Sequence, residues 1–363
     1  MKKFLNDRGI IRRYLAHLPV ADTTPIISLN EGATPLIHSP RLSALVGSDA
    51  EVYLKYEGLN PTGSFKDRGM TLAMSKAVER GAEAVICAST GNTSASAAAY
   101  AARAGLPCIV VLPAGKIAFG KLMQAFACGA KVVAINGSFD DALRIVRELG
   151  QMNKFDVVNS INPYRIEGQK TAAFEVIDEL EDAPDFHFLP VGNAGNITAY
   201  WKGYEEFRLC GRSTQKPRMV GYQAEGSAPI FYDRIIEKPE TIATAIRIGN
   251  PASWKGATAA VTLSNGAMGV VTDDEILNGQ RWLAENEGVF VEPASAASVA
   301  GLMKSIADAG EGKGPLFNLK KGMKIVCTVT GHGLKDTETP ILKNRETLES
   351  EATSEAVRSV LGL

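Results

Sequence analysis

The feature that most constrains this chain is an alternation of short apolar segments with amphipathic helical segments, which starts near residue 51. Residues 52–55 and 85–88 have the pattern of strands, and apolar residues recur at helical spacing between them. We expect Ser64 to cap this helix and Gly81 to end it in the left-handed conformation. Continuous apolar strands joined by helical crossovers predict parallel sheets with helices on both faces. The predicted fold class is therefore α/β.

The same pattern predicts further elements along most of the chain. Helices are expected at 92–104, 116–128, 139–149, 164–180, 197–209, 273–286 and 295–308, and strands at 108–112, 131–135, 156–160, 186–191, 219–224 and 323–329. Residues 225–268 are less regular, and 344–363 have the composition of a charged surface helix. The length predicts about two domains. We expect a smaller domain over 46–158 and a larger one formed by 1–45 and 159–363, each an open, mostly parallel sheet flanked by helices.

The composition argues against several kinds of partner. Among 363 residues, 39 Lys+Arg and 40 Asp+Glu give a net charge of −1, which offers no basic surface to nucleic acid or to an anionic membrane. No apolar run reaches the ~18 residues of a membrane span, and residues 1–8 are charged too early for a signal peptide. The five cysteines form no Cys-x-x-Cys pair and the four histidines are scattered. We therefore expect a cytoplasmic protein with reduced thiols, no metal site, and no nucleic-acid or membrane partner.

Glycine is in excess, with 35 of 363 residues against an average of ~7%. Many of these glycines lie between a predicted strand and the helix that follows it. Open α/β sheets bind ligands at such turns, outside the carboxyl ends of the strands. Five turns combine glycine with polar side chains and are the candidate sites: 60–69, 88–94, 159–170, 192–196 and 328–336.

Two cations lie in the first turn of predicted helices, where the helix dipole disfavours positive charge. Lys66 also lies on the buried face of its helix, so its side chain either extends its ammonium to water or has a lowered pKa suited to bonding an aldehyde. Arg165 follows Asn162, a capping residue, and Pro163, which suits the first helical position. Its guanidinium either reaches solvent or holds an anion, for which its fork suits phosphate.

Three turns offer polar groups at the ends of strands. Residues 88–94 place five polar side chains at a helix start, which is more than an ordinary capping turn requires and suits a carboxylate. The backbone N–H groups of 192–196 can surround a phosphate, although a lone Gly-x-x-Gly is more often a tight turn than a site. That turn lacks the full dinucleotide and triphosphate signatures. Residues 328–336 end the last buried strand with a hydroxyl and two glycines.

Together these turns resemble the threonine synthase family, which belongs to the fold type II, tryptophan-synthase-β-like, pyridoxal-phosphate enzymes. Three motifs carry the resemblance: Asn60-Pro61-Thr62-Gly63-Ser64-Phe65-Lys66-Asp67-Arg68-Gly69, Ser89-Thr90-Gly91-Asn92-Thr93 and Gly192-Asn193-Ala194-Gly195-Asn196. The match runs from about Gly32 to Asp336. Related dehydratases and cysteine synthases usually have other glycine-rich versions of the third motif, which favours threonine synthase.

The resemblance implies a role for each matched residue. Lys66 would bond the cofactor aldehyde and later transfer protons, Asn92 would hydrogen-bond the ring hydroxyl, and Thr330 would face the pyridine nitrogen. The cofactor phosphate would be held by Gly192, Asn193, Ala194, Gly195 and Asn196. Ser89, Thr90 and Thr93 would bind the substrate carboxylate or phosphate. The candidates for the substrate phosphate are Asn159, Ser160, Arg165, Lys55 and Lys116, with solvent exposure as the alternative for the two lysines.

The implied reaction converts O-phospho-L-homoserine and water to L-threonine and phosphate. Phosphate leaves the γ-carbon and water adds at the β-carbon. The alternatives are a threonine/serine dehydratase, a β-replacement enzyme such as a cysteate synthase, and a non-catalytic sensor of pyridoxal phosphate or an amino acid. A homodimer is the family expectation.

Overall fold

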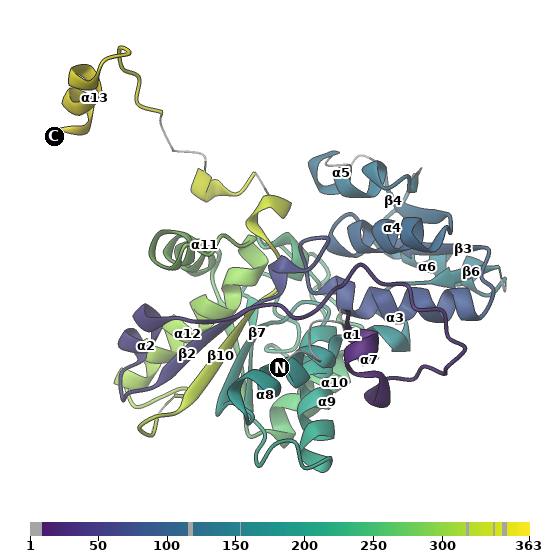
Figure 1. The fold of residues 1–363 in the computed structure, drawn as a ribbon, viewed down its shortest axis with the longest axis horizontal. Helices are drawn as coiled ribbons and strands as arrows, with labels where there is room; N and C mark the ends of the chain where they lie inside the picture. Colours follow the sequence, from purple (N-terminus) through teal and green to yellow (C-terminus); the bar gives the residue numbers. More distant parts are fainter. Residues whose placement is uncertain (1–8, 115–118, 153, 317–318, 337, 343–346) are drawn as a thin grey trace.

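The computed structural model describes residues 9–114, 119–152, 154–316, 319–336, 338–342 and 347–363. These residues form two sheets that lie side by side, each flanked by helices (Figure 1). Strand β1 pairs antiparallel with β2, and the other strand pairs are parallel. The predicted α/β class is confirmed.

The larger sheet has six strands in the order β1-β2-β10-β7-β8-β9. Their bounds are β1 Leu36–His38, β2 Glu51–Tyr56, β7 Phe186–Pro190, β8 Arg218–Ala224, β9 Ala267–Val271 and β10 Lys324–Val329. Alternation along β10 sends Ile325 and Cys327 to one core and Val326 to the other. The first core is covered by α2 Pro40–Val46, α11 Asp273–Trp282 and α12 Pro293–Gly310. The second is covered by α8 Thr171–Leu180, α9 Gly195–Leu209 and α10 Trp254–Leu263.

The smaller sheet has four strands in the order β5-β4-β3-β6. Their bounds are β3 Ala84–Ala88, β4 Cys108–Pro113, β5 Lys131–Ile135 and β6 Phe155–Val157. One face packs against α3 Lys66–Glu79, α4 Asn92–Ala104 and α5 Phe119–Ala127. The other face packs against α6 Phe139–Gly150. The predicted left-handed glycine after α3 is confirmed, since Gly81 has φ +72°.

The remaining elements connect or extend these layers. They are α1 Ile10–Arg13, α7 Pro163–Gln169, the π-helical turn η5 Leu283–Glu287, α13 Ser354–Leu361, and the 3₁₀ turns η2 Leu15–His17, η3 Glu57–Leu59, η4 Thr244–Ile246, η6 Gly333–Lys335 and η7 Pro340–Leu342. Helix α13 is exposed and lies apart from the rest of the molecule (Figure 1). In the part of the chain that the structure describes, no helix is long and apolar enough to cross a membrane.

Several predicted elements differ from the structure. The single helix expected over 164–180 is two helices, α7 and α8, which meet at Lys170. Helix α7 approaches α3 so closely that a side chain at Gly168 would collide with the Arg68 carbonyl. Ser64 does not cap α3, since Phe65 occupies the capping position. The irregular region 225–268 contains α10, which buries just two alanines and so shows little helical periodicity.

The strand pairing also bears on the predicted division of the chain. Strand β2, which falls within the predicted smaller domain 46–158, pairs with β10 over six residues and so belongs to the six-stranded sheet. The chain therefore passes to the smaller sheet after Tyr56 rather than at residue 46. The division into two domains itself stays a prediction.

Candidate active site

The end of strand β10 meets the start of helix α3. Ser64 and Gly331 form an antiparallel bridge, and the Phe65 N–H donates to the Thr330 carbonyl at 3.0 Å. Lys66 is the next residue and the first of α3. These contacts place the lysine beside the carboxyl end of the larger sheet, where ligands of open α/β sheets bind.

Lys66 has the electrostatic character of a reactive amine. Burial lowers its pKa to about 7, the charge of Arg165 lowers it as well, and the carboxylate of Glu292 opposes both. The Lys66 Nζ lies 4.1 Å from the centroid of the Phe65 ring. A large share of the amine is therefore neutral at pH 7, and the neutral form is the one that acts as a nucleophile or proton acceptor.

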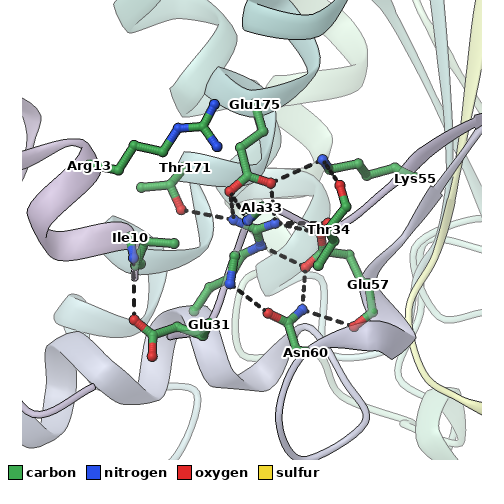
Figure 2. Close-up of polar contacts among 12 residues, drawn as sticks. Ile10, Arg13, Glu31, Ala33, Thr34, Lys55, Glu57, Asn60, Thr171 and Glu175 are labelled. Carbon is green, nitrogen blue, oxygen red and sulfur yellow. Dashed lines mark hydrogen bonds and ion pairs between the residues drawn. The ribbon is translucent and has the colours of Figure 1, made fainter. Parts of the chain in front are cut away.

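A buried ion network holds the first turn of α3 in place. Arg68, two residues after Lys66, donates to both carboxylate oxygens of Glu57 at 2.6 and 2.7 Å. It also donates to both oxygens of Glu175, at 2.8 and 2.6 Å. Burial alone would lower the pKa of Arg68, but the two carboxylates raise it well above its usual value. Glu57 belongs to η3 and Glu175 to α8, so the network ties α3 to both elements, and Figure 2 shows the two carboxylates within it.

Lys55 belongs to this network and not to the candidate site. Its Nζ donates to the Thr34 carbonyl at 2.7 Å and forms an ion pair with Glu175 at 3.0 Å (Figure 2). It forms a second ion pair with Glu179 at 3.3 Å. The expectation that Lys55 binds the substrate phosphate is therefore not supported, because its donors already have partners. The alternative of solvent exposure is wrong too, since Lys55 is 0% exposed. Lys116, the other lysine candidate, lies outside the described residues.

Arg165 is a second buried arginine, and its donors are not all used. Asn162 caps α7 and Pro163 takes its first position, as predicted, and this turn directs Arg165 inward, where it is 1% exposed. Its Nη1 donates to the Val158 carbonyl at 2.7 Å, whereas Nε and Nη2 have no partner among the described residues. Burial lowers the pKa of Arg165 to about 10. The alternative of a solvent-exposed guanidinium is wrong, and a buried cation with two unsatisfied donors fits the other alternative, an anion site.

The turn 192–196 has the geometry of an anion cradle. Ala194 takes the left-handed conformation with φ +63° and leads directly into α9. In the described part of the chain no side chain caps this helix, and Nδ2 of the buried Asn196 has no partner. At Gly192, a Cβ would lie 2.7 Å from the Ile246 Cα, so a larger residue does not fit. The free N–H groups and the unpartnered amide leave room and donors for a phosphate.

Neighbouring polar residues position this turn and the strand next to it. Asn193 donates through Nδ2 to the Ser160 hydroxyl, and its Oδ1 accepts from the Ala252 N–H at 2.6 Å. Asn159 exchanges two hydrogen bonds of 2.9 Å with the backbone of Ala88, at the end of β3. Asn159 therefore holds the strand end from which residues 89–93 project, and Ser160 lies against the 192–196 turn.

The start of helix α4 offers a second set of donors. Ser89, Thr90 and Thr93 are partly exposed, and the Ser89 hydroxyl accepts from the Gly91 N–H at 3.2 Å. No side chain of the described residues caps α4. Free N–H groups, hydroxyls and the helix dipole together suit a carboxylate or phosphate.

Asn92 and Thr330 each contact a residue that the sequence analysis did not identify. The Asn92 Nδ2 lies 2.9 and 3.1 Å from the two carboxylate oxygens of Glu292. The Thr330 hydroxyl lies 2.9 Å from that of Ser295, which also accepts from the Gly331 N–H at 2.7 Å. Glu292 and Ser295 both lie at the start of α12, and the sequence marks that start, because Glu292-Pro293 follows an apolar segment.

Pyridoxal phosphate fits the groups assembled here. The unpartnered Asn196 amide and the helix start after Ala194 suit its phosphate, and the amine of Lys66 suits its aldehyde. Within the described ranges, no cluster of three or more His, Cys, Asp or Glu could hold a metal ion. The fold and this donor set define a pyridoxal-phosphate enzyme.

Comparisons with known proteins agree with this class. Residues 27–331 match the family described as "Pyridoxal-phosphate dependent enzyme". The chain is 57% identical over 331 residues to a threonine synthase of Synechocystis sp., covering 91% of this chain and 84% of that protein. It is 58% identical over 332 residues to a threonine synthase of Halalkalibacterium halodurans, covering 92% and 91%. The chain belongs to the threonine synthase family of pyridoxal-phosphate dependent enzymes.

A solved structure of an O-ureido-L-serine synthase has the same fold. It superimposes with a TM-score of 0.72 and 18% sequence identity, covering 94% of this chain and all of the other. The identity is too low for this likeness to show more than the fold. The expected resemblance to the fold type II enzymes is thus confirmed at the level of sequence and of architecture.

Proposed function

We propose that this enzyme converts O-phospho-L-homoserine and water to L-threonine and phosphate. One observation carries the proposal: Lys66, an amine with a pKa of about 7, lies within electrostatic range of Arg165, a buried guanidinium whose Nε and Nη2 have no partner among the described residues. A proton-transferring amine beside a guanidinium with free donors is what release of phosphate from this substrate requires. The relatives named threonine synthase support the same conclusion.

The cofactor supplies an aldehyde that bonds amines and a ring that delocalises electrons from the substrate α-carbon. We assign its aldehyde to Lys66, its ring hydroxyl to Asn92, its ring nitrogen to Thr330, and its phosphate to the turn 192–196. The hydrogen bond between Thr330 and Ser295 supports the third assignment, because it orients a hydroxyl at this position. A hydroxyl, unlike a carboxylate, does not force the ring nitrogen to stay protonated.

We assign the two anionic ends of the substrate to two different loops. Ser89, Thr90 and Thr93 bind the carboxylate at the start of α4, where the helix dipole favours negative charge. Arg165 donates Nε and Nη2 to the phosphate, with the Ser160 hydroxyl as a further contact. Asn159 contributes by holding the loop that carries Ser89. Lys55 has no part in this site, and Lys116 is left as a candidate.

The residues then act in sequence on the substrate. Lys66 removes the proton of the α-carbon, and a β-proton is lost as the bond between the γ-carbon and the phosphate oxygen breaks. Arg165 stabilises the negative charge of the departing phosphate. Water adds a hydroxyl to the β-carbon, and protons return to the α- and γ-carbons. One water enters and one phosphate leaves.

The test is an assay of the purified holoenzyme. It should be yellow, lose its visible absorbance with borohydride, and release phosphate from O-phospho-L-homoserine in equal amount to threonine. Lys66→Ala should abolish turnover, whereas Lys131→Ala, which changes an exposed lysine on β5, should not.

Other outcomes would favour the alternatives. A protein that makes just 2-oxobutanoate from threonine is a dehydratase, and one that exchanges a β-substituent is a β-replacement enzyme such as a cysteate synthase. A yellow protein with no turnover of any of these substrates is a sensor. A colourless protein that binds no pyridoxal phosphate would overturn the proposal at its base.

We further propose that the enzyme is a cytoplasmic homodimer that needs no nucleic-acid or membrane partner. The free thiols of all five cysteines support a reducing compartment. The net charge of −1 supports the absence of a polyanionic partner. Sedimentation velocity at micromolar concentration tests the dimer, and a single monomeric species would contradict it.

A further inference from the structure

Glu292 occupies a position where its side chain has no role in its own helix. It is the N-cap residue of α12, but its carboxylate makes no capping hydrogen bond to that helix. Residues that cap helices are commonly Ser, Thr, Asp or Asn, whose short side chains reach the free N–H groups. Glu292 instead extends away from α12 and is 6% exposed. A buried carboxylate is costly unless it has a partner.

The partner of Glu292 lies on the other sheet. Its two oxygens accept from Nδ2 of Asn92, at 2.9 and 3.1 Å, so the contact joins α12 of the larger sheet to the first residue of α4. A Cβ at position 331 would collide with Oε1 of Glu292, so the glycine after Thr330 is what admits the carboxylate. The Glu292 N–H also donates to the Gly331 carbonyl at 3.1 Å. The carboxylate is thus held between the end of β10 and the start of α4.

This contact determines which way the Asn92 amide faces. An ionised carboxylate accepts hydrogen bonds and donates none, so the atom of Asn92 that faces it must be Nδ2. The Asn92 oxygen and the remaining N–H must then point away from Glu292. A neutral amide at position 292 would lose this discrimination, because it can accept from one orientation of Asn92 and donate to the other.

We propose that Glu292 is a positioning residue of the active site, which fixes the orientation of the Asn92 amide and thereby presents it to the cofactor ring. The inference rests on the proposed contact between Asn92 and the ring hydroxyl. Glu292 touches no reacting atom in this scheme and acts through Asn92. Its charge adds a second effect, since it favours the protonated state of the Lys66 nitrogen.

The charged surroundings define the sign of that second effect. The carboxylate of Glu292 is faced by Lys66 from α3 and by Lys335 and Asp336 from η6 and its end. Lys66 is faced by Arg165 from α7 in addition to Glu292. Burial raises the pKa of Glu292, and the Asn92 hydrogen bond and Lys335 oppose that rise. Neutralising Glu292 removes a negative charge that favours a protonated Lys66 nitrogen, so that nitrogen should lose its proton at lower pH.

The test compares holoenzymes carrying E292Q and E311Q. Glu311 is an exposed carboxylate at the other end of the same helix α12, so E311Q removes an equal charge without touching the site. In E292Q we expect the pH midpoint of the bound cofactor absorbance to fall by about 1 unit, the usual size for loss of a neighbouring opposite charge. We also expect cofactor affinity to fall about tenfold, the size of one hydrogen bond to a charged group. E311Q should match the wild type in both.

A double variant separates positioning from general stability. If Glu292 acts through Asn92, E292Q should cost no further cofactor affinity in an N92A background. An equal loss in both backgrounds would overturn the inference, as would an E292Q holoenzyme with wild-type titration and affinity. If E292Q melts early but titrates like the wild type, Glu292 is merely structural and the inference fails. A wild-type protein that binds no cofactor would instead overturn the proposed function.

Discussion

The two buried arginines near Lys66 have opposite surroundings. Arg68 is 0% exposed and donates to both oxygens of two carboxylates, which raise its pKa well above the usual value. Arg165 is 1% exposed, has two nitrogens without a partner in the described ranges, and has a pKa lowered to about 10. Arg68 belongs to the first turn of α3 and Arg165 packs against that turn at Gly69. Within that part of the chain, the hydrogen-bond donors of Arg68 all have partners, whereas those of Arg165 do not. Burial alone therefore does not distinguish a binding site from a structural ion network. A buried cation marks a candidate binding site when some of its hydrogen-bond donors have no partner.

The largest effect is expected on removal of Arg68, the arginine whose donors all have partners. Arg68→Met leaves Glu57 buried without its cation and leaves Glu175 paired with Lys55 alone, and breaking a buried ion pair costs about 3–5 kcal/mol of unfolding free energy. Urea unfolding measures the loss. Arg68→Lys should recover just part of it, because an ammonium cannot bond both oxygens of two carboxylates. An Arg68→Met protein as stable as the wild type would show that the network does not hold α3.

The unsaturated arginine should behave in the reverse way. Arg165→Met should lower kcat/KM for phosphate release by about 100- to 1000-fold, the usual cost of removing a donor to developing charge. It should leave the melting temperature close to that of the wild type, because among the described residues the side chain loses one hydrogen bond, to the Val158 carbonyl. Assays with O-phospho-L-homoserine and thermal melting measure the two effects. If the Arg165→Met protein is unfolded, Arg165 has a structural role like that of Arg68, and the proposed difference between the two arginines is wrong.

A smaller effect is expected on how the free energy of unfolding depends on pH. In the cofactor-free protein, Lys66 releases its proton at a pKa of about 7, whereas an unfolded lysine keeps it to about 10.4. The unfolded chain binds more protons in this window, so the free energy of unfolding should rise with pH by up to about 1.4 kcal/mol per unit between 7 and 10. Arg68, whose pKa is raised, stays charged in this window and adds no such slope.

Unfolding by urea at pH 7, 8 and 9 measures this dependence. Lys66→Met should flatten the slope, while Lys131→Met, on the exposed face of β5, should keep it. Equal slopes in all three proteins would show that Lys66 is not the group responsible.

The order of strands and helices could be predicted because it depends on local patterns. Helix α4 and strand β5 have the bounds that the sequence pattern predicts, since each is bordered by turn-forming residues. The break between α7 and α8 could not be predicted, because the helical pattern of the sequence continues through Lys170, where the two helices meet. Helix α10 was missed for a related reason, since it buries little and shows little periodicity.

The candidate site divides in the same way. The sequence by itself determined that Lys66 and Arg165 sit at helix starts and that 192–196 is a glycine-rich turn after a strand. The tertiary structure decided which cations have partners: Lys55 is paired with Glu175 and Glu179, whereas Arg165 has donors to spare. It also decided that Glu292 meets Asn92. Hydrogen-bond partners depend on which distant segments fold against each other, and one sequence without its fold does not contain those distances.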